Sequence, residues 1–93
     1  MSSIDLLRIE TVASRRGRGR SQLYLDIREG LMTPSLRLSR KLSAWPSHEV
    51  DALNRAEIAG ATPEEIRALV CQLVEQRRHA FDTYRESGSE LAA

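Results

Sequence analysis

The chain has 93 residues, enough for one small domain with a modest hydrophobic core. Hydrophobic residues make up 41% and charged residues 29%, which is typical of a soluble globular domain. No stretch approaches the roughly 18 consecutive apolar residues that a membrane span needs, so we expect a cytoplasmic protein without a membrane partner. The single cysteine, Cys71, excludes an internal disulfide, and with the two isolated histidines, His48 and His79, it provides no zinc ligand set.

The formal net charge is only +1, but the charges are distributed unevenly along the chain. Residues 1–46 contain nine Lys and Arg residues against four acids, whereas residues 47–93 contain five Arg residues against nine acids. A basic first half joined to an acidic second half is typical of a nucleic-acid-facing surface attached to a scaffold.

Two short helices are predicted near the N-terminus. Residues 8–16 carry apolar side chains at helical spacing, and Gly17 and Gly19 then interrupt the pattern. A second helix follows from about residue 20 to residue 29, with Gly30 well placed as its stop. Two short helices joined by a turn with glycines form the outline of a helix-turn-helix.

A β-hairpin is predicted next, because Pro34 excludes a continuing helix. Residues 35–39 alternate between polar and apolar side chains, as a half-buried strand does. A basic turn at 40–41 and a second strand at 42–45 complete the hairpin. The only tryptophan, Trp45, is expected to anchor the hairpin to the helices in the core.

Two further helices follow the hairpin. Ser47 is the expected N-cap of the first, which ends at Gly60. Thr62 and Glu65 then form a capping box for a long amphipathic helix that is expected to end near Arg85. The predicted fold class is mainly α with a small β-hairpin: a winged helix-turn-helix plus a C-terminal amphipathic helix. We expect the DNA-binding domain at residues 1–60, the C-terminal helix at 61–86 and a tail at 87–93.

The basic residues coincide with the predicted turn, second helix and hairpin. In a helix-turn-helix the second helix enters the major groove, where Arg pairs with guanine and Gln with adenine. The expected DNA-binding residues of the turn and recognition helix are Arg16, Arg18, Arg20, Ser21, Gln22, Tyr24 and Arg28. Those of the wing are Arg37, Arg40 and Lys41. An alternative interpretation is a solvated arginine-rich loop, which would require two basic clusters to coincide with turn and wing by accident.

Several short motifs resemble those of the AlpA-type regulators and excisionases, which are small MerR-like winged helix-turn-helix proteins of prophages and integrative elements. The segments that carry the resemblance are Leu6-Leu7-Arg8-Ile9, Gly17 to Tyr24, Arg28-Glu29-Gly30, Ala44-Trp45 and Glu49-Val50-Asp51-Ala52. The resemblance implies sequence-specific binding of double-stranded DNA, often cooperative and with DNA bending. It also implies a role as a recombination directionality factor, a transcriptional activator or both.

The chain departs from the family pattern within this region. Arg18 replaces the apolar residue of the turn, and Gly19 replaces the capping serine. Leu25 and Asp26 reverse the usual polar-then-apolar order, an order that would leave Leu25 exposed and Asp26 buried.

The C-terminal helix has two interpretations. Its apolar stripe could pack in the core, or its later part could contact another protein, because so long a helix cannot bury its whole stripe on so small a body. The candidate partners are a second copy on neighbouring DNA and a site-specific recombinase. The protein-contact candidates are Leu73, Arg77, Phe81 and Tyr84.

An enzyme is not expected, because the sequence shows no phosphate-binding loop, nucleophile set or metal cluster. No cofactor and no small-molecule substrate are therefore predicted. We favour an excisionase that binds near attachment sites. An AlpA-like transcriptional activator is the alternative, and a protein-interaction module such as an anti-activator is a second one.

Overall fold

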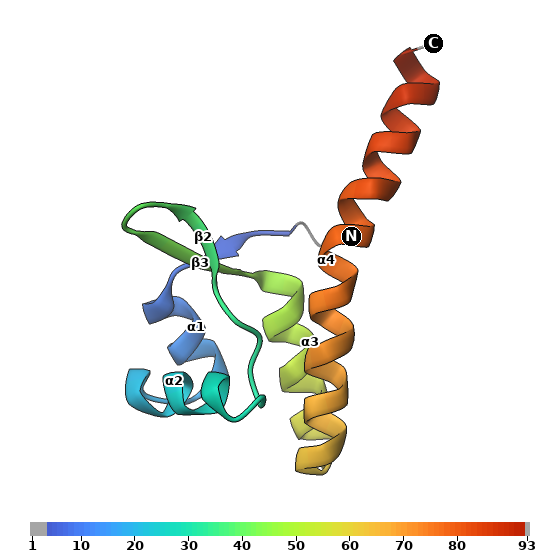
Figure 1. Ribbon diagram of the computed structural model, residues 1–93. Helices are drawn as coiled ribbons and strands as arrows, with labels where there is room; N and C mark the ends of the chain where they lie inside the picture. Colours follow the sequence, from blue (N-terminus) through green and yellow to red (C-terminus); the bar gives the residue numbers. More distant parts are fainter. Residues whose placement is uncertain (1–3, 93) are drawn as a thin grey trace.

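The computed structural model describes residues 4–92. The chain is mainly helical, with a small antiparallel sheet at one end (Figure 1). Its elements, in chain order, are β1 (Leu6–Leu7), α1 (Ile9–Arg16), α2 (Arg20–Arg28), β2 (Leu36–Ser39), β3 (Leu42–Pro46), α3 (Ser47–Ile58) and α4 (Pro63–Ala92).

The sheet has three strands in the order β1-β3-β2. The hairpin of β2 and β3 was predicted, with Leu36 opposite Ala44 across it. The short strand β1 was not, and it pairs Leu7 with Trp45 on the other side of β3. Two residues are too few to show an alternating pattern, and their partners lie almost forty positions away, so sequence periodicity could not reveal this strand.

The two N-terminal helices match the prediction within one or two residues. α1 ends at Gly17, which has a left-handed φ of 67°, and the turn after α2 uses Gly30 with φ 79°. Both conformations favour glycine, which lacks the Cβ atom that would clash there. Leu23 on the inner face of α2 is fully buried.

The start of α3 corrects the prediction that Ser47 is its N-cap. Pro46 occupies the cap position in an extended conformation, and Ser47 is the first residue of the helix. The hydroxyl oxygen of Ser47 instead accepts a hydrogen bond from the backbone N–H of Asp5 at 2.8 Å, while its own N–H donates to the carbonyl of Asp5 at 2.7 Å. Ser47 therefore ties the segment before β1 to α3.

The capping box of α4 is confirmed. The Glu65 carboxylate accepts from the N–H of Thr62 at 2.8 Å, and the Thr62 hydroxyl accepts from the N–H of Glu65 at 3.2 Å. The predicted helix end near Arg85 and the tail at 87–93 are wrong, because α4 continues to Ala92. Gly88 costs a helix only about 1 kcal/mol relative to alanine, so without a proline nothing in this segment forces the helix to end.

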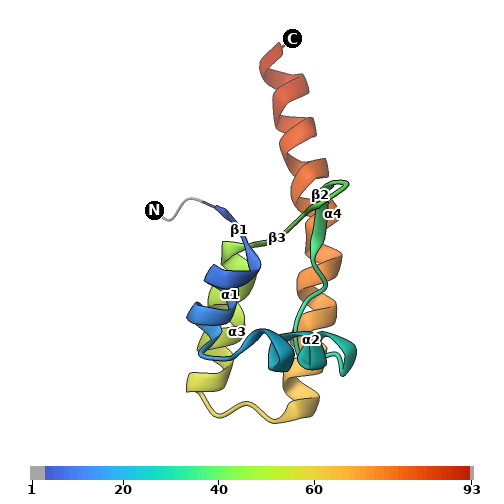
Figure 2. The ribbon, with the colours of Figure 1, turned by 90° about the vertical axis from the view of Figure 1, so that its left-hand side faces the viewer.

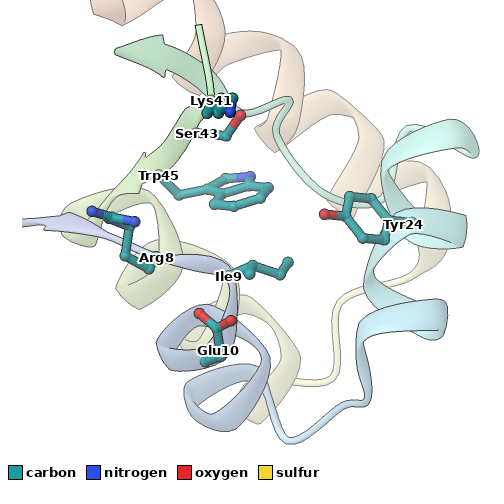
Figure 3. Close-up of a pocket in the computed structure, with 7 residues that line it drawn as sticks. All are labelled: Arg8, Ile9, Glu10, Tyr24, Lys41, Ser43 and Trp45. Atoms are coloured by element: carbon teal, nitrogen blue, oxygen red, sulfur yellow. The ribbon is translucent and has the colours of Figure 1, made fainter. Parts of the chain in front are cut away.

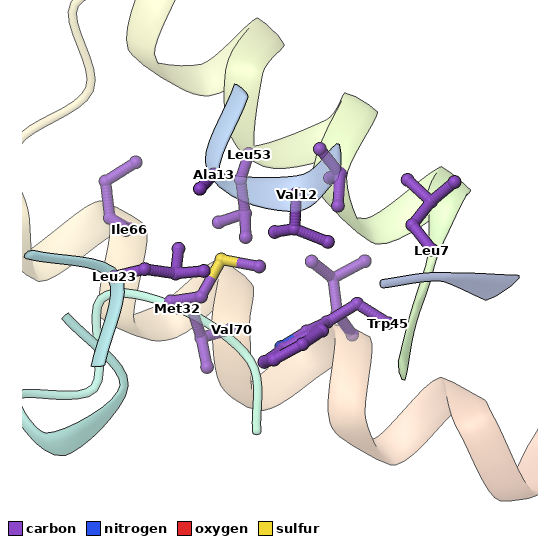
Figure 4. Close-up of a cluster of buried hydrophobic side chains, with 11 residues drawn as sticks. Leu7, Val12, Ala13, Leu23, Met32, Trp45, Leu53, Ile66 and Val70 are labelled. Atoms are coloured by element: carbon purple, nitrogen blue, oxygen red, sulfur yellow. The ribbon is translucent and has the colours of Figure 1, made fainter. Parts of the chain in front are cut away.

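The core forms where α1, α2, β3, α3 and α4 meet (Figure 4). Trp45 lies at its centre with 1% of its surface exposed, and its indole N–H donates to the carbonyl of Thr33 at 2.9 Å. The core-anchor prediction for Trp45 is thus confirmed. From α4, the core includes Ile66, Val70 and Leu73.

The first half of α4 packs beside α3, and the second half projects away from the rest of the protein (Figures 1 and 2). With 30 residues this helix is about 45 Å long at 1.5 Å per residue. None of the described helices combines the length and the apolar character that crossing a membrane would require.

Candidate nucleic-acid interface

The hairpin, α1 and α2 face the side of the protein that lies away from α4 (Figure 1). Five exposed basic residues, located just before α1, on α2 and in the hairpin, have no ion-pair partner among the side chains that the structure describes, and we call this group the basic face. It consists of Arg8, Arg28, Arg37, Arg40 and Lys41. Guanidinium and ammonium groups without a carboxylate partner are free to bind an external anion.

On α2, the exposed residues Ser21, Tyr24 and Arg28 follow one another at spacings of three and four, so they share one outward stripe. The opposite face carries the buried residues Leu23 and Asp26. Three of the seven residues predicted for the turn and recognition helix therefore lie together on an accessible helix face.

The hairpin residues predicted for the wing are all exposed. One guanidinium nitrogen of Arg37 donates to the backbone carbonyl of Arg40 at 3.0 Å. This bond orders the tip of the hairpin, and it leaves both arginine side chains without a carboxylate partner. Leu38 between them is 44% exposed. The tip thus presents three cationic side chains and one apolar side chain.

A pocket of about 300 Å³ separates the hairpin from the two helices (Figure 3). Its lining comes from the start of α1, the middle of α2 and strand β3, and consists of Arg8, Ile9, Glu10, Tyr24, Lys41, Ser43 and Trp45. Sequence reasoning assigned no role to Arg8, Glu10 or Ser43. Arg8 stands between β1 and α1, and its position next to β3 depends on a strand pairing that local periodicity does not show.

Arg20, the first residue of α2, forms an ion pair with Glu10 of α1. A hydrogen bond from its own backbone N–H is the largest cause that holds the pKa of Glu10 below its usual value of 4.5. Desolvation raises this pKa, but the charges of Arg20 and Arg8 and the hydrogen bond from Arg20 add to the lowering. Both side chains are more than half exposed, so Arg20 can exchange Glu10 for another anion at little cost.

Arg16 does not belong to the interface, which corrects its prediction as a DNA contact. Its side chain is 1% exposed and donates to Asn54 at 2.8 Å and to Glu57 at 2.5 Å. Arg18 also donates to Glu57, at 2.8 Å, and forms an ion pair with Asp26 at 3.2 Å. These arginines attach the turn between α1 and α2 to α3, because Asn54 and Glu57, their main partners, belong to α3.

The reversed order of Leu25 and Asp26 has the expected consequence. Leu25 is 39% exposed, and Asp26 is 5% exposed. The buried carboxylate of Asp26 is matched by Arg18, and it also accepts a hydrogen bond from the amide of Gln22 at 2.9 Å. Gln22 is therefore held at the side of α2 rather than presented on its outward stripe.

On α4, two of the predicted protein-contact residues are used within the chain. Leu73 is 5% exposed in the core, and Arg77 binds Glu49. Phe81 is 51% exposed, with the guanidinium groups of Arg78 and Arg85 at 5.4 and 5.7 Å from its ring centre. The side chain of the fourth predicted residue, Tyr84, lies outside the part of the chain that the structure describes.

No known protein family, no characterised protein and no solved structure matches this chain. Among the side chains that the structure describes, no group of three or more His, Cys, Asp or Glu residues is placed to hold a metal ion. The function is therefore inferred from the charges and the geometry of the basic face.

Proposed function

We propose that this protein binds duplex DNA as a winged helix-turn-helix, with α2 in the major groove and the β2–β3 hairpin as the wing. The observation that carries the proposal is the basic face itself. The elements that carry these basic residues, α2 and the hairpin, are separate in sequence but lie together on the side of the protein away from α4 (Figure 1), and the residues have no carboxylate partner among the described side chains.

The dimensions of α2 suit this role. An α-helix with its side chains is about 10–12 Å across and fits the major groove, which is about 12 Å wide. Ser21 and Arg28 on the outward stripe can donate to base edges or phosphates, and the hairpin arginines can bind phosphates of the flanking backbone. Arg20 can join them once an external anion displaces Glu10.

Within DNA binding, we propose an excisionase of a mobile element that binds cooperatively near attachment sites and bends the DNA. This part rests on the motif resemblance to AlpA-type regulators and excisionases. An AlpA-like activator would instead bind upstream of one promoter. An anti-activator that binds only protein would leave the basic face without a ligand.

The distal part of α4 is the surface that we assign to protein contacts. It projects from the side away from the basic face, so it stays accessible when DNA is bound (Figure 1). Phe81 lies in this part of α4, and its ring is 51% exposed. We propose a second copy on adjacent DNA as its partner, and a site-specific recombinase is the alternative.

The test is a DNA-binding titration with the duplex that neighbours the element's attachment site, compared with a shuffled duplex. We expect discrete successive shifts on the attachment duplex, and weaker binding by Arg28→Ala and Arg40→Ala. Arg40→Ala should also reduce the steepness of the log–log salt dependence by about one unit, since one phosphate contact is lost. Arg78→Ala removes the same charge from α4 and should bind like the wild type.

A single shift on promoter DNA would favour the activator. Absence of binding to any duplex at low salt would refute DNA binding altogether. An unchanged salt dependence in Arg40→Ala would refute the assignment of the hairpin as a wing that contacts phosphate.

A further inference from the structure

We propose that the pocket between α1, α2 and β3 seats one phosphodiester group of the bound duplex, held between Arg8 and Lys41. This inference rests on the proposed function, since it assumes that the basic face binds DNA. It adds a specific backbone anchor located between the recognition helix and the wing, and it assigns a DNA contact to Arg8, for which the sequence predicted none.

The charges of the pocket favour an anion. Arg8 enters from the position before α1 and Lys41 from the turn before β3, and both are exposed without an ion-pair partner among the described side chains. The hydroxyl of Tyr24 is turned toward the pocket from α2, and Ser43 adds a second hydroxyl from β3 (Figure 3). Two cations and two hydroxyl donors from three elements are a suitable set for the oxygens of one phosphate.

The size and the floor of the pocket favour one backbone unit of a DNA strand over a free small molecule. Its volume of about 300 Å³ lies at the lower limit of the range that pockets for whole ligands occupy. Ile9 lines its inner part and is partly exposed, so it can pack against a deoxyribose next to the phosphate, whereas Trp45 is 1% exposed and only closes the floor (Figure 3). One nucleotide backbone unit therefore matches both the polar and the apolar lining.

The carboxylate of Glu10 restricts where an anion can bind in this pocket. Glu10 supplies this carboxylate to the pocket lining, and Arg20 pairs with it. A phosphate must therefore bind toward Arg8 and Lys41, away from Glu10. We infer that Glu10 weakens the attraction of the face for DNA in general, so that Glu10→Gln should bind any duplex several-fold more tightly.

The experiment scans the bound duplex with single methylphosphonate substitutions, each of which removes the charge of one phosphate. Binding is measured by fluorescence anisotropy at fixed salt for the wild type, Arg8→Ala, Lys41→Ala and the control Arg37→Ala. At one position on the duplex, the neutral linkage should weaken binding of the wild type and of Arg37→Ala several-fold. At that same position it should have little further effect on Arg8→Ala and Lys41→Ala.

If no position shows this coupling while the wild type still binds duplex DNA with a steep salt dependence, the pocket assignment is overturned and the proposed function stands. If the wild type binds no duplex at low salt, both fail. Weaker binding by Glu10→Gln would overturn the inference that the Glu10 carboxylate opposes the binding of DNA. Circular dichroism of each variant checks folding, which should be intact because Arg8, Arg37 and Lys41 are exposed.

Discussion

At the residue scale, Glu49 is a buried carboxylate that needs a charged hydrogen-bond partner. Its side chain is completely buried, and Arg77 binds both of its oxygens at 2.7 Å. The same guanidinium donates to the carbonyl of Pro34 at 2.7 Å. Arg77 thus joins α3, α4 and the segment before β2 at one point.

We expect Arg77→Ala to lower the free energy of unfolding by about 3–5 kcal/mol, because it leaves a buried carboxylate without a partner. Urea unfolding monitored by circular dichroism measures the change. The neighbouring Arg78→Ala removes an exposed ion pair and should cost less than about 1 kcal/mol. Arg77→Met combined with Glu49→Leu should recover most of the stability, and its failure to do so would show that shape rather than charge matters at this contact.

Glu57 makes the free energy of unfolding depend on pH. Burial raises its pKa, but hydrogen bonds from Arg18 and Arg16 outweigh burial, so the pKa of Glu57 lies below its usual 4.5. A lowered pKa in the folded state adds stability above the unfolded value, and this stability is lost as the pH falls through the folded pKa. The loss should therefore begin below about pH 4.5.

The matching variant is Glu57→Gln, which cannot titrate at this position. Urea midpoints measured between about pH 3 and pH 7 should fall less steeply with acid in Glu57→Gln than in the wild type. At neutral pH the variant should be the less stable of the two, because Arg16 remains buried with a weaker partner. Parallel pH profiles for the two proteins would refute a role of Glu57 in acid sensitivity.

At the scale of elements, the start of α4 depends on its capping box. Thr62→Ala removes the hydroxyl that accepts from the N–H of Glu65 and should cost about 1 kcal/mol of stability. Glu65→Ala removes the reciprocal bond, and the double variant should lose less than the sum of the two single losses if the bonds support each other. Thermal unfolding measures all three, with the exposed Glu64→Ala as the control.

At the scale of the whole molecule, α4 separates two tasks along one helix. Its first half closes the core through Ile66, Val70 and Leu73, while its second half projects beyond the body of the protein (Figure 1). A variant in the second half should therefore change assembly without changing stability.

We expect Phe81→Ser to reduce the cooperativity of binding to a duplex with adjacent sites, while its affinity for a single site and its thermal midpoint stay near those of the wild type. The reason is that Phe81 is half exposed and adds little to the core. Gel shifts on one-site and two-site duplexes measure both quantities. Unchanged cooperativity would exclude Phe81 from contacts between copies and leave a recombinase as the partner to test.

The sequence by itself determined α2, the hairpin and the start of α4. Helical spacing and Gly30 defined α2, alternation and Pro34 defined the hairpin, and the pair Thr62 and Glu65 defined the start of α4. Each of these signals acts over a few residues, so it is readable without knowledge of the fold. The exposed wing residues could be predicted for the same reason, since a basic turn between two strands is solvated.

Only the tertiary structure decided which charges remain free. Arg16 and Arg40 look alike in sequence, yet folding brings Glu57 and Asn54 to Arg16 and leaves Arg40 exposed. The same holds for Arg8, whose place in the pocket depends on the pairing of β1 with β3. The ion pair of Arg16 with Glu57 and the pocket around Arg8 each join residues about forty positions apart. The energy of such contacts depends on burial and distance, which local sequence patterns do not contain.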